Sequence, residues 1–151
     1  MKLVRTSEMQ WADAMNHGQF LQRRKPLGGT RLSCGLWELA PGKKSFPFHL
    51  HHLTEEALFV VSGAAKVRTP DGLTPVGPGD FVSFPAGGPA HQVINDGTEP
   101  LVYLAIAAGM GVDVVEYPDS KKVAASVGAP GSGKRFIFKE SAQTHYFDGE
   151  E

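Results

Sequence analysis

The sequence is short of cysteine, of net charge and of long apolar runs. Cys34 is the single cysteine, so no disulfide can form within the chain and a reducing compartment is favoured. Its 15 lysines and arginines nearly balance 16 aspartates and glutamates, which gives no electrostatic reason to expect nucleic acid or an anionic membrane as partner. No run approaches the roughly 20 apolar residues of a membrane-spanning helix, and residues 1–8 lack the apolar core of a signal peptide. These absences predict a soluble, cytoplasmic protein.

Turn-forming residues are abundant, with 18 glycines and 11 prolines among 151 residues. Turn sequences recur at roughly the 8–12 residue spacing of β-sandwiches and barrels. The strands expected between them cover residues 32–39, 46–52, 56–61, 64–69, 81–84, 90–95 and 101–107. The side chains expected to form the core or line a pocket are Phe46, Phe48, Leu58, Val60, Phe84 and Tyr103. The length suits a single domain of 1–151, and the pattern predicts an all-β fold.

The two ends of the chain lack the regular strand-and-turn pattern of the middle. Residues 7–18 could form a brief helix capped by Ser7. Beyond Gly111 the sequence predicts a turn-rich extension over 113–122, a small-residue linker over 126–133 and a late edge strand over 135–138. We expect residues 112–151 to form an arm packed on the barrel or on a neighbouring subunit.

A glycine pattern near this end imitates a phosphate-binding loop. Gly128, Gly133 and Lys134 satisfy the Gly-x4-Gly-Lys spacing, but Arg135 follows where a magnesium-binding hydroxyl is required. Too few residues remain after Lys134 for a nucleotide-binding α/β sheet. We therefore interpret the segment as a linker.

Two histidines in the first half of the chain favour a metal site. His49 and His51 are two residues apart, so both imidazoles leave the same face of a strand. A carboxylate follows at Glu55 or Glu56, and a later stretch contributes His91. Imidazoles with a carboxylate are ligands for a divalent transition metal, and Zn, Mn, Fe, Co, Ni and Cu all remain open.

These stretches resemble the two motifs of the cupin superfamily. His49, His51, Glu56 and Gly63 fit the register of the first motif, and Gly79, Pro85, Gly87, His91 and Asn95 fit the second. The resemblance covers about residues 30 to 107 and implies a double-stranded β-helix, a small jelly-roll barrel, with N- and C-terminal extensions. It implies His49, His51, Glu56 and His91 as metal ligands. His52, Glu55 and Gln92 are then expected outside that set, and Cys34 is expected to be a small packed side chain.

The resemblance leaves three functions open. The chain looks like small bacterial cupins labelled sugar-phosphate or mannose-6-phosphate isomerases, which implies a metal-dependent enzyme on a small polyoxygenated metabolite. The alternatives are an Fe-dependent dioxygenase and a non-catalytic carbohydrate or metabolite binder. Neither motif offers a further His or Glu as the base that isomerisation needs. Lys66 and Arg68, on one strand face, could hold a phosphate, but the favoured interpretation is an exposed basic face. The resemblance also implies a homodimer.

Overall fold

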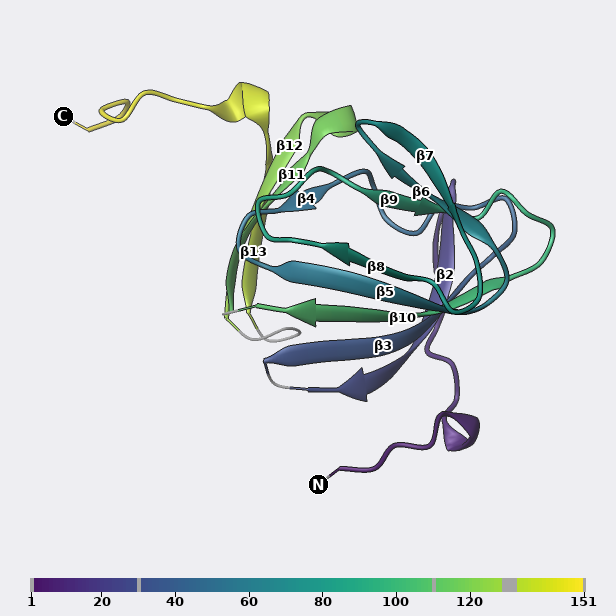
Figure 1. Ribbon diagram of the computed structural model, residues 1–151. Helices are drawn as coiled ribbons and strands as arrows, with labels where there is room; N and C mark the ends of the chain where they lie inside the picture. Colours follow the sequence, from purple (N-terminus) through teal and green to yellow (C-terminus); the bar gives the residue numbers. More distant parts are fainter. Residues whose placement is uncertain (1, 30, 110, 129–132, 151) are drawn as a thin grey trace.

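The computed structural model describes residues 2–29, 31–109, 111–128 and 133–150 (Figure 1). Thirteen strands run through these residues: β1 Met15–His17, β2 Phe20–Gly28, β3 Leu32–Leu39, β4 Leu50–His51, β5 Glu55–Ser62, β6 Ala65–Thr69, β7 Gly72–Val76, β8 Phe81–Phe84, β9 Gln92–Ile94, β10 Leu101–Ala108, β11 Val112–Tyr117, β12 Lys122–Val127 and β13 Lys134–Lys139. Three short 3-10 turns complete them: η1 Thr6–Glu8, η2 Pro118–Ser120 and η3 Glu140–Ala142. The expected all-β class is confirmed.

One layer of the barrel is a six-stranded antiparallel sheet in the order β1-β2-β3-β10-β5-β8. Its central strand β10 pairs with β3 on one side and β5 on the other. Strands far apart in the sequence therefore lie side by side, as Figure 1 shows for β3, β10, β5 and β8.

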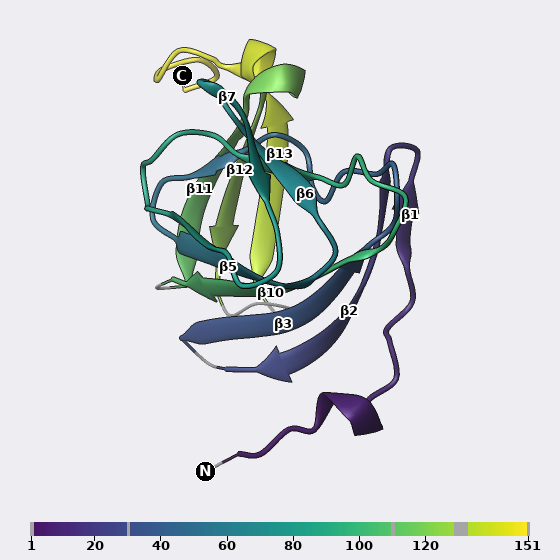
Figure 2. The ribbon, with the colours of Figure 1, turned by 45° about the vertical axis from the view of Figure 1, so that its right-hand side comes forward.

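The other layer combines two smaller sheets, β13-β12-β11-β4 and β7-β6-β9. An antiparallel bridge between His49 and His91 joins them, with backbone N–H···O distances of 2.7 and 3.2 Å. Figure 2 shows β11, β12 and β13 side by side, and the two chain ends at opposite ends of the molecule. The two sequence motifs thus meet at one bridge, as a double-stranded β-helix requires.

The core lies between the layers. Its fully buried members include Leu39, Val60 and Leu101, and Leu58 and Tyr103 are each only 3% exposed. Phe48 is buried as expected, whereas Phe46 and Phe84 are half-buried. Each of the two rings lies beside a motif histidine, Phe46 with its centroid 6.3 Å from that of His49 and Phe84 3.7 Å from that of His91.

Several expected elements differ from the structure. The strand expected over 46–52 is regular only at β4, because Pro47 has no N–H to donate to a ladder. The helix expected over 7–18 is absent from the described residues, which hold η1 and β1 there instead. The extension over 113–122 is strand β11, the turn η2 and the start of β12, not a run of turns. The edge strand expected over 135–138 is confirmed as β13.

The expected linker over 126–133 lies partly in β12, and its residues 129–132, which include part of the glycine pattern, lie outside the described residues. Strand β2 was not predicted from the sequence. It lies before the predicted barrel core of residues 30–107 and extends the sheet by pairing with β3. None of the described helices is long and apolar enough to cross a membrane.

The glycine and asparagine that end the two motifs have structural tasks. Gly63 has φ of 80°, and a Cβ there would lie 2.4 Å from the carbonyl oxygen of Pro100. Only glycine fits that turn. Asn95 is fully buried and ties the backbone of Leu39, Gly97 and Glu99 together through its amide.

Candidate metal centre

The backbone brings the three motif histidines together. His49 and His51 project from the same side of the chain around β4, and the bridge to His91 places that side chain opposite His49. The rings of His49 and His51 lie 5.1 Å apart between centroids, and those of His49 and His91 lie 4.6 Å apart. Strand alternation and one bridge thus suffice to gather three imidazoles.

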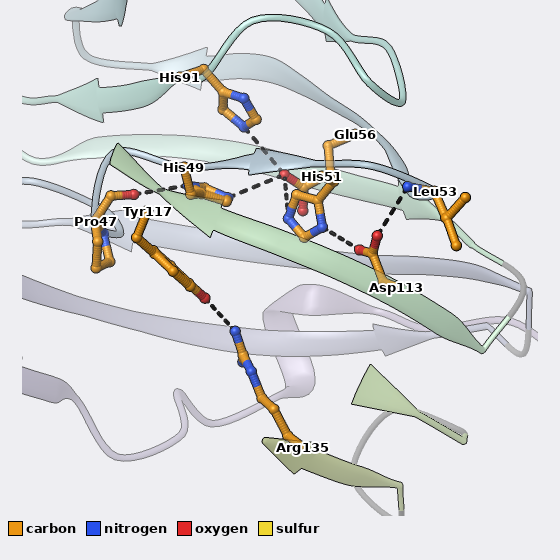
Figure 3. Close-up of polar contacts among 9 residues, drawn as sticks. All are labelled: Pro47, His49, His51, Leu53, Glu56, His91, Asp113, Tyr117 and Arg135. Atoms are coloured by element: carbon orange, nitrogen blue, oxygen red, sulfur yellow. Dashed lines mark hydrogen bonds and ion pairs between the residues drawn. The ribbon is translucent and has the colours of Figure 1, made fainter. Parts of the chain in front are cut away.

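The fourth predicted residue, Glu56, enters from the opposite layer on β5. The Oε2 atom of Glu56 lies 3.6 Å from Nε2 of His49, 3.4 Å from Nε2 of His51 and 3.2 Å from Nε2 of His91 (Figure 3). Ligand atoms of His49, His51 and Glu56 lie mutually within 4.8 Å, and His91 falls outside that tighter group. The structure therefore supports a possible site at His49, His51 and Glu56, which His91 borders.

The hydrogen bonds behind the rings determine which nitrogen faces the centre. The Nδ1 atom of His49 donates to the carbonyl oxygen of Pro47 at 2.8 Å, and Nδ1 of His51 contacts the carboxylate of Asp113. A carbonyl and a carboxylate only accept, so both Nδ1 atoms carry hydrogen. In the neutral rings both Nε2 lone pairs then face Oε2 of Glu56, which is unfavourable unless a cation lies between them. This donor set fits a divalent metal.

His91 is held differently. Its ring stacks on that of Phe84, with centroids 3.7 Å apart and an angle of 6°. Its buried Nδ1 has no hydrogen-bond partner among the described residues. Burial lowers the pKa of His91, against the opposing effect of Glu56, so the ring stays neutral as a ligand must.

The acidic groups remain ionised. Burial alone would raise the pKa of Glu56, but the neighbouring imidazoles of His49, His91 and His51 lower it well below its usual range. Burial likewise opposes ionisation of Asp113, and contacts with His51 and the Leu53 N–H outweigh it, so its pKa is lowered. Both carboxylates are thus negative at neutral pH.

Asp113 is a site residue that sequence reasoning missed. It lies on β11, where it is 7% exposed, and orients His51 through Nδ1. The alternation of Asp113, Val115 and Tyr117, all buried, was the available signal. Read as a strand, these residues share one face, and that face is the one His51 occupies through its pairing with Val115.

Tyr117 extends the site beyond the histidines. Its ring stacks on that of His49, with centroids 6.1 Å apart and an angle of 24°. Its hydroxyl accepts a hydrogen bond from Arg135 on β13 (Figure 3). Burial raises the pKa of Tyr117 against the opposing effect of Arg135, so the phenol stays protonated.

The remaining candidates lie away from the centre. His52 is exposed and contacts Glu116 at 2.7 Å, and Glu55 is exposed. Gln92 is buried and donates to the carbonyl oxygen of Phe46, while Cys34 is half-buried with a pKa raised by burial.

The two basic side chains considered as phosphate contacts, Lys66 and Arg68, are each paired with an acid. Lys66 lies 2.6 Å from Asp96, and Arg68 makes two hydrogen bonds to Asp119 at 2.6 and 2.9 Å. Their charges are thus already compensated within the chain.

Phe84 also lines a cavity of about 170 Å³. Apolar side chains dominate its lining, among them Val67, Val76 and Val82. None of the four predicted ligands lines it, so this cavity is separate from the candidate metal centre.

Comparison with known proteins places this geometry in a family. The chain matches the Cupin domain family over residues 35–107. A provisionally assigned sugar phosphate isomerase from Acidithiobacillus ferrooxidans is 31% identical, with 95% of each chain covered and a TM-score of 0.83. A cupin-superfamily sugar phosphate isomerase from Silicibacter pomeroyi is 22% identical over 97% of this chain and 98% of that one, with a TM-score of 0.81.

A more distant structure shows how widely the fold is used. An oxalate decarboxylase by prediction, from Thermotoga maritima, is 19% identical over 72% of this chain and 100% of that one, with a TM-score of 0.65. No curated protein matches the chain. The full-length similarity at 31% identity and the family match together decide the assignment: this chain belongs to the cupin family.

Proposed function

We propose that this cupin is a metal-dependent enzyme that isomerises a small sugar phosphate. The convergence of three Nε2 atoms on Oε2 of Glu56 carries the proposal. His49, His51, Glu56 and His91 would hold a divalent metal, which would supply a Lewis acid for the carbonyl and hydroxyl oxygens of the substrate. The 31% identical Acidithiobacillus protein supports the choice of reaction.

The chain's own residues would supply position and charge. Asp113 keeps a hydrogen on Nδ1 of His51 and so leaves Nε2 free for the metal. Phe84 fixes the plane of His91, and Tyr117 does the same beside His49. A site held this rigidly orients a substrate without reorganisation.

A dioxygenase is the second candidate, and two observations favour it. The tight group of His49, His51 and Glu56 is the two-histidine, one-carboxylate set used by non-haem iron oxygenases. Moreover, both carboxylates at the centre, the half-buried Glu56 and the buried Asp113, are engaged by histidines within the described structure. Neither is left free as the base that isomerisation needs.

Elemental analysis followed by a proton-transfer assay separates the candidates. Protein purified without added metal is analysed, then incubated in deuterated water with a panel of sugar phosphates, hydroxy acids and diketones. We expect a bound metal and deuterium in an isomerised sugar phosphate. Iron with oxygen uptake would support the dioxygenase instead. Binding without turnover, aerobically and anaerobically, would reduce the protein to a metabolite binder.

A further inference from the structure

Three cationic side chains share the face of the second layer that carries the histidines. The pairing of Tyr117 with Lys122, and of Lys122 with Lys139, puts these side chains on one face of β11, β12 and β13. Ser126 is paired with both Asp113 and Arg135, which places Arg135 on that face as well. Because Asp113 contacts His51, this is the face toward the metal centre.

Two of these cations meet at a single aromatic ring. The Nζ atom of Lys122 lies 5.3 Å from the centroid of Tyr117, and Arg135 donates to the Tyr117 hydroxyl. The same ring stacks on His49. Figure 3 shows Arg135 reaching from β13 toward the histidines, with Tyr117 between them. The side chain of Tyr117 thus lies between these two cations and His49 of the candidate metal centre.

Neither cation is neutralised within the described residues. No carboxylate oxygen lies within 4.0 Å of Lys122 or Arg135 there, whereas Arg23, Lys66 and Arg68 each have an acidic partner. Arg135 uses one of five N–H donors on the phenol. The phenol accepts from Arg135 and keeps its own hydrogen to donate elsewhere.

We propose that Arg135, Lys122 and Tyr117 form an anion subsite that binds the phosphate of a phosphorylated ligand. The inference rests on the proposed function, which requires a phosphate contact beside the metal. A guanidinium fork, an ammonium and a hydroxyl are donors suited to a phosphate monoester. The span of Tyr117 then separates the phosphate from the ligand oxygens that face the metal. Lys66 and Arg68, which the sequence left as a less favoured phosphate contact, are paired with Asp96 and Asp119 instead.

Titration of metal-free protein with inorganic phosphate tests the subsite by itself. Arg135→Gln is compared with Lys134→Gln, since Lys134 is the preceding residue on the same strand and points to the other face. Lys122→Gln is compared with Lys121→Gln, which lies in the turn before β12. We expect calorimetry to show at least ~10-fold weaker phosphate binding in Arg135→Gln and Lys122→Gln, as loss of one charge-assisted hydrogen bond predicts. The two controls should bind like the parent.

Two further comparisons separate a phosphate-binding role of Arg135 from a purely structural one: the conservative variant Arg135→Lys, and a sugar tested with and without its phosphate. Arg135→Lys should recover part of the phosphate affinity, and melting curves of all variants verify folding. In metal-loaded protein, Arg135→Gln should weaken fructose 6-phosphate and leave fructose unchanged. Equal losses for both sugars, equal losses in Lys134→Gln, or no phosphate binding by the parent would overturn the subsite.

The test of the anion subsite can succeed or fail separately from the proposed isomerase activity. Phosphate binding that depends on Arg135 without any isomerisation would retain the subsite and reject the proposed activity. Isomerisation with an unchanged KM in Arg135→Gln would retain the activity and reject the subsite.

Discussion

At the scale of single residues, the tautomers of two histidines decide what the centre can hold. The acceptors behind His49 and His51 fix hydrogen on Nδ1 and turn both Nε2 lone pairs toward Glu56. A pair of lone pairs facing a carboxylate oxygen repels anions and neutral acceptors alike. The same arrangement attracts a cation, and its affinity depends on groups that never touch the cation.

We expect His49→Ala, His51→Ala, Glu56→Ala and His91→Ala each to remove most of the bound metal. Each change deletes one of the atoms that converge on the centre. His52→Ala and Glu55→Ala are the matched controls and should keep the parent metal content, because both side chains are exposed. Metal stoichiometry by elemental analysis makes the comparison. Loss in Glu55→Ala with retention in Glu56→Ala would reverse the carboxylate assignment.

Asp113→Asn should weaken metal binding without removing a ligand. The neutral amide oxygen of asparagine accepts the hydrogen bond from Nδ1 of His51 less strongly than the carboxylate does. Losing such a partner behind a metal-binding histidine costs about 10–100-fold in metal affinity. Glu116→Gln is the control, since Glu116 contacts only the exposed His52 among the described histidines. Competition with a chromogenic chelator gives both affinities. Equal values for the two variants would remove Asp113 from the site.

At the scale of elements, the turns between strands hold the two layers in register. Gly63 closes the turn between β5 and β6 against the backbone of Pro100, just before β10. The contact lies at the end of the β5–β10 pairing opposite the one that carries Glu56.

Gly63→Ala should therefore destabilise the protein far more than Gly42→Ala. Both glycines have positive φ, 80° and 69°, but a Cβ at Gly42 meets no described atom within 4 Å. The left-handed conformation alone costs about 1–2 kcal/mol, and overpacking against Pro100 should add ~1–3 kcal/mol. Chemical denaturation measures the free energy of unfolding. Comparable losses in both variants would show that the Pro100 contact is dispensable.

The elements also show what the sequence could and could not predict. Strand parity and the register of the cupin motifs predicted the four residues that the structure brings together around the centre, while their role as metal ligands stays a prediction. Asp113 could not be linked to His51 across 62 residues of sequence, and the strand it lies on was mistaken for turns. The partners of Lys66 and Arg68 were invisible for the same reason. Strand β2 was missed because it carries Arg23, Arg24, Lys25 and Pro26, and Pro26 lies at a register shift.

At the scale of the whole molecule, acid should act through the histidines. The pKa of His91 is lowered in the folded protein, so the unfolded chain takes up a proton first as pH falls below its reference near ~6.5. Stability is fully present above that pH and declines as the pH drops below it. Metal is released in the same window, since protons compete for Nε2. Thermal melting with metal analysis checks this, and a flat melting temperature from neutral to about pH 4.5 with metal retained would contradict it.

We also expect a homodimer with a two-fold interface. Phe136, Ile137 and Phe138 on β13 are 50%, 55% and 49% exposed, and β13 is the outer strand of its sheet among the described strands. An apolar edge of this kind needs cover, and a second copy offers the same edge in an antiparallel sense. Phe138→Asp should produce monomers in sedimentation at micromolar concentration. Phe81→Asp, on the exposed edge strand β8, should leave the dimer intact. A parent protein that sediments as a monomer would reject the expectation.

The pairing of β4 with β11 has a consequence for synthesis of the protein. A nascent chain that has emerged only as far as Ala108 already contains His49, His51, Glu56 and His91, yet it lacks Asp113 and Tyr117. The imidazole of His51 is then free to adopt either tautomer, and any early metal is held by a partly ordered set of ligands. Secure loading must wait until β11 has left the ribosome and docked. We therefore expect any metal to be selected in the cell by the finished chain, from the ions present once β11 has docked.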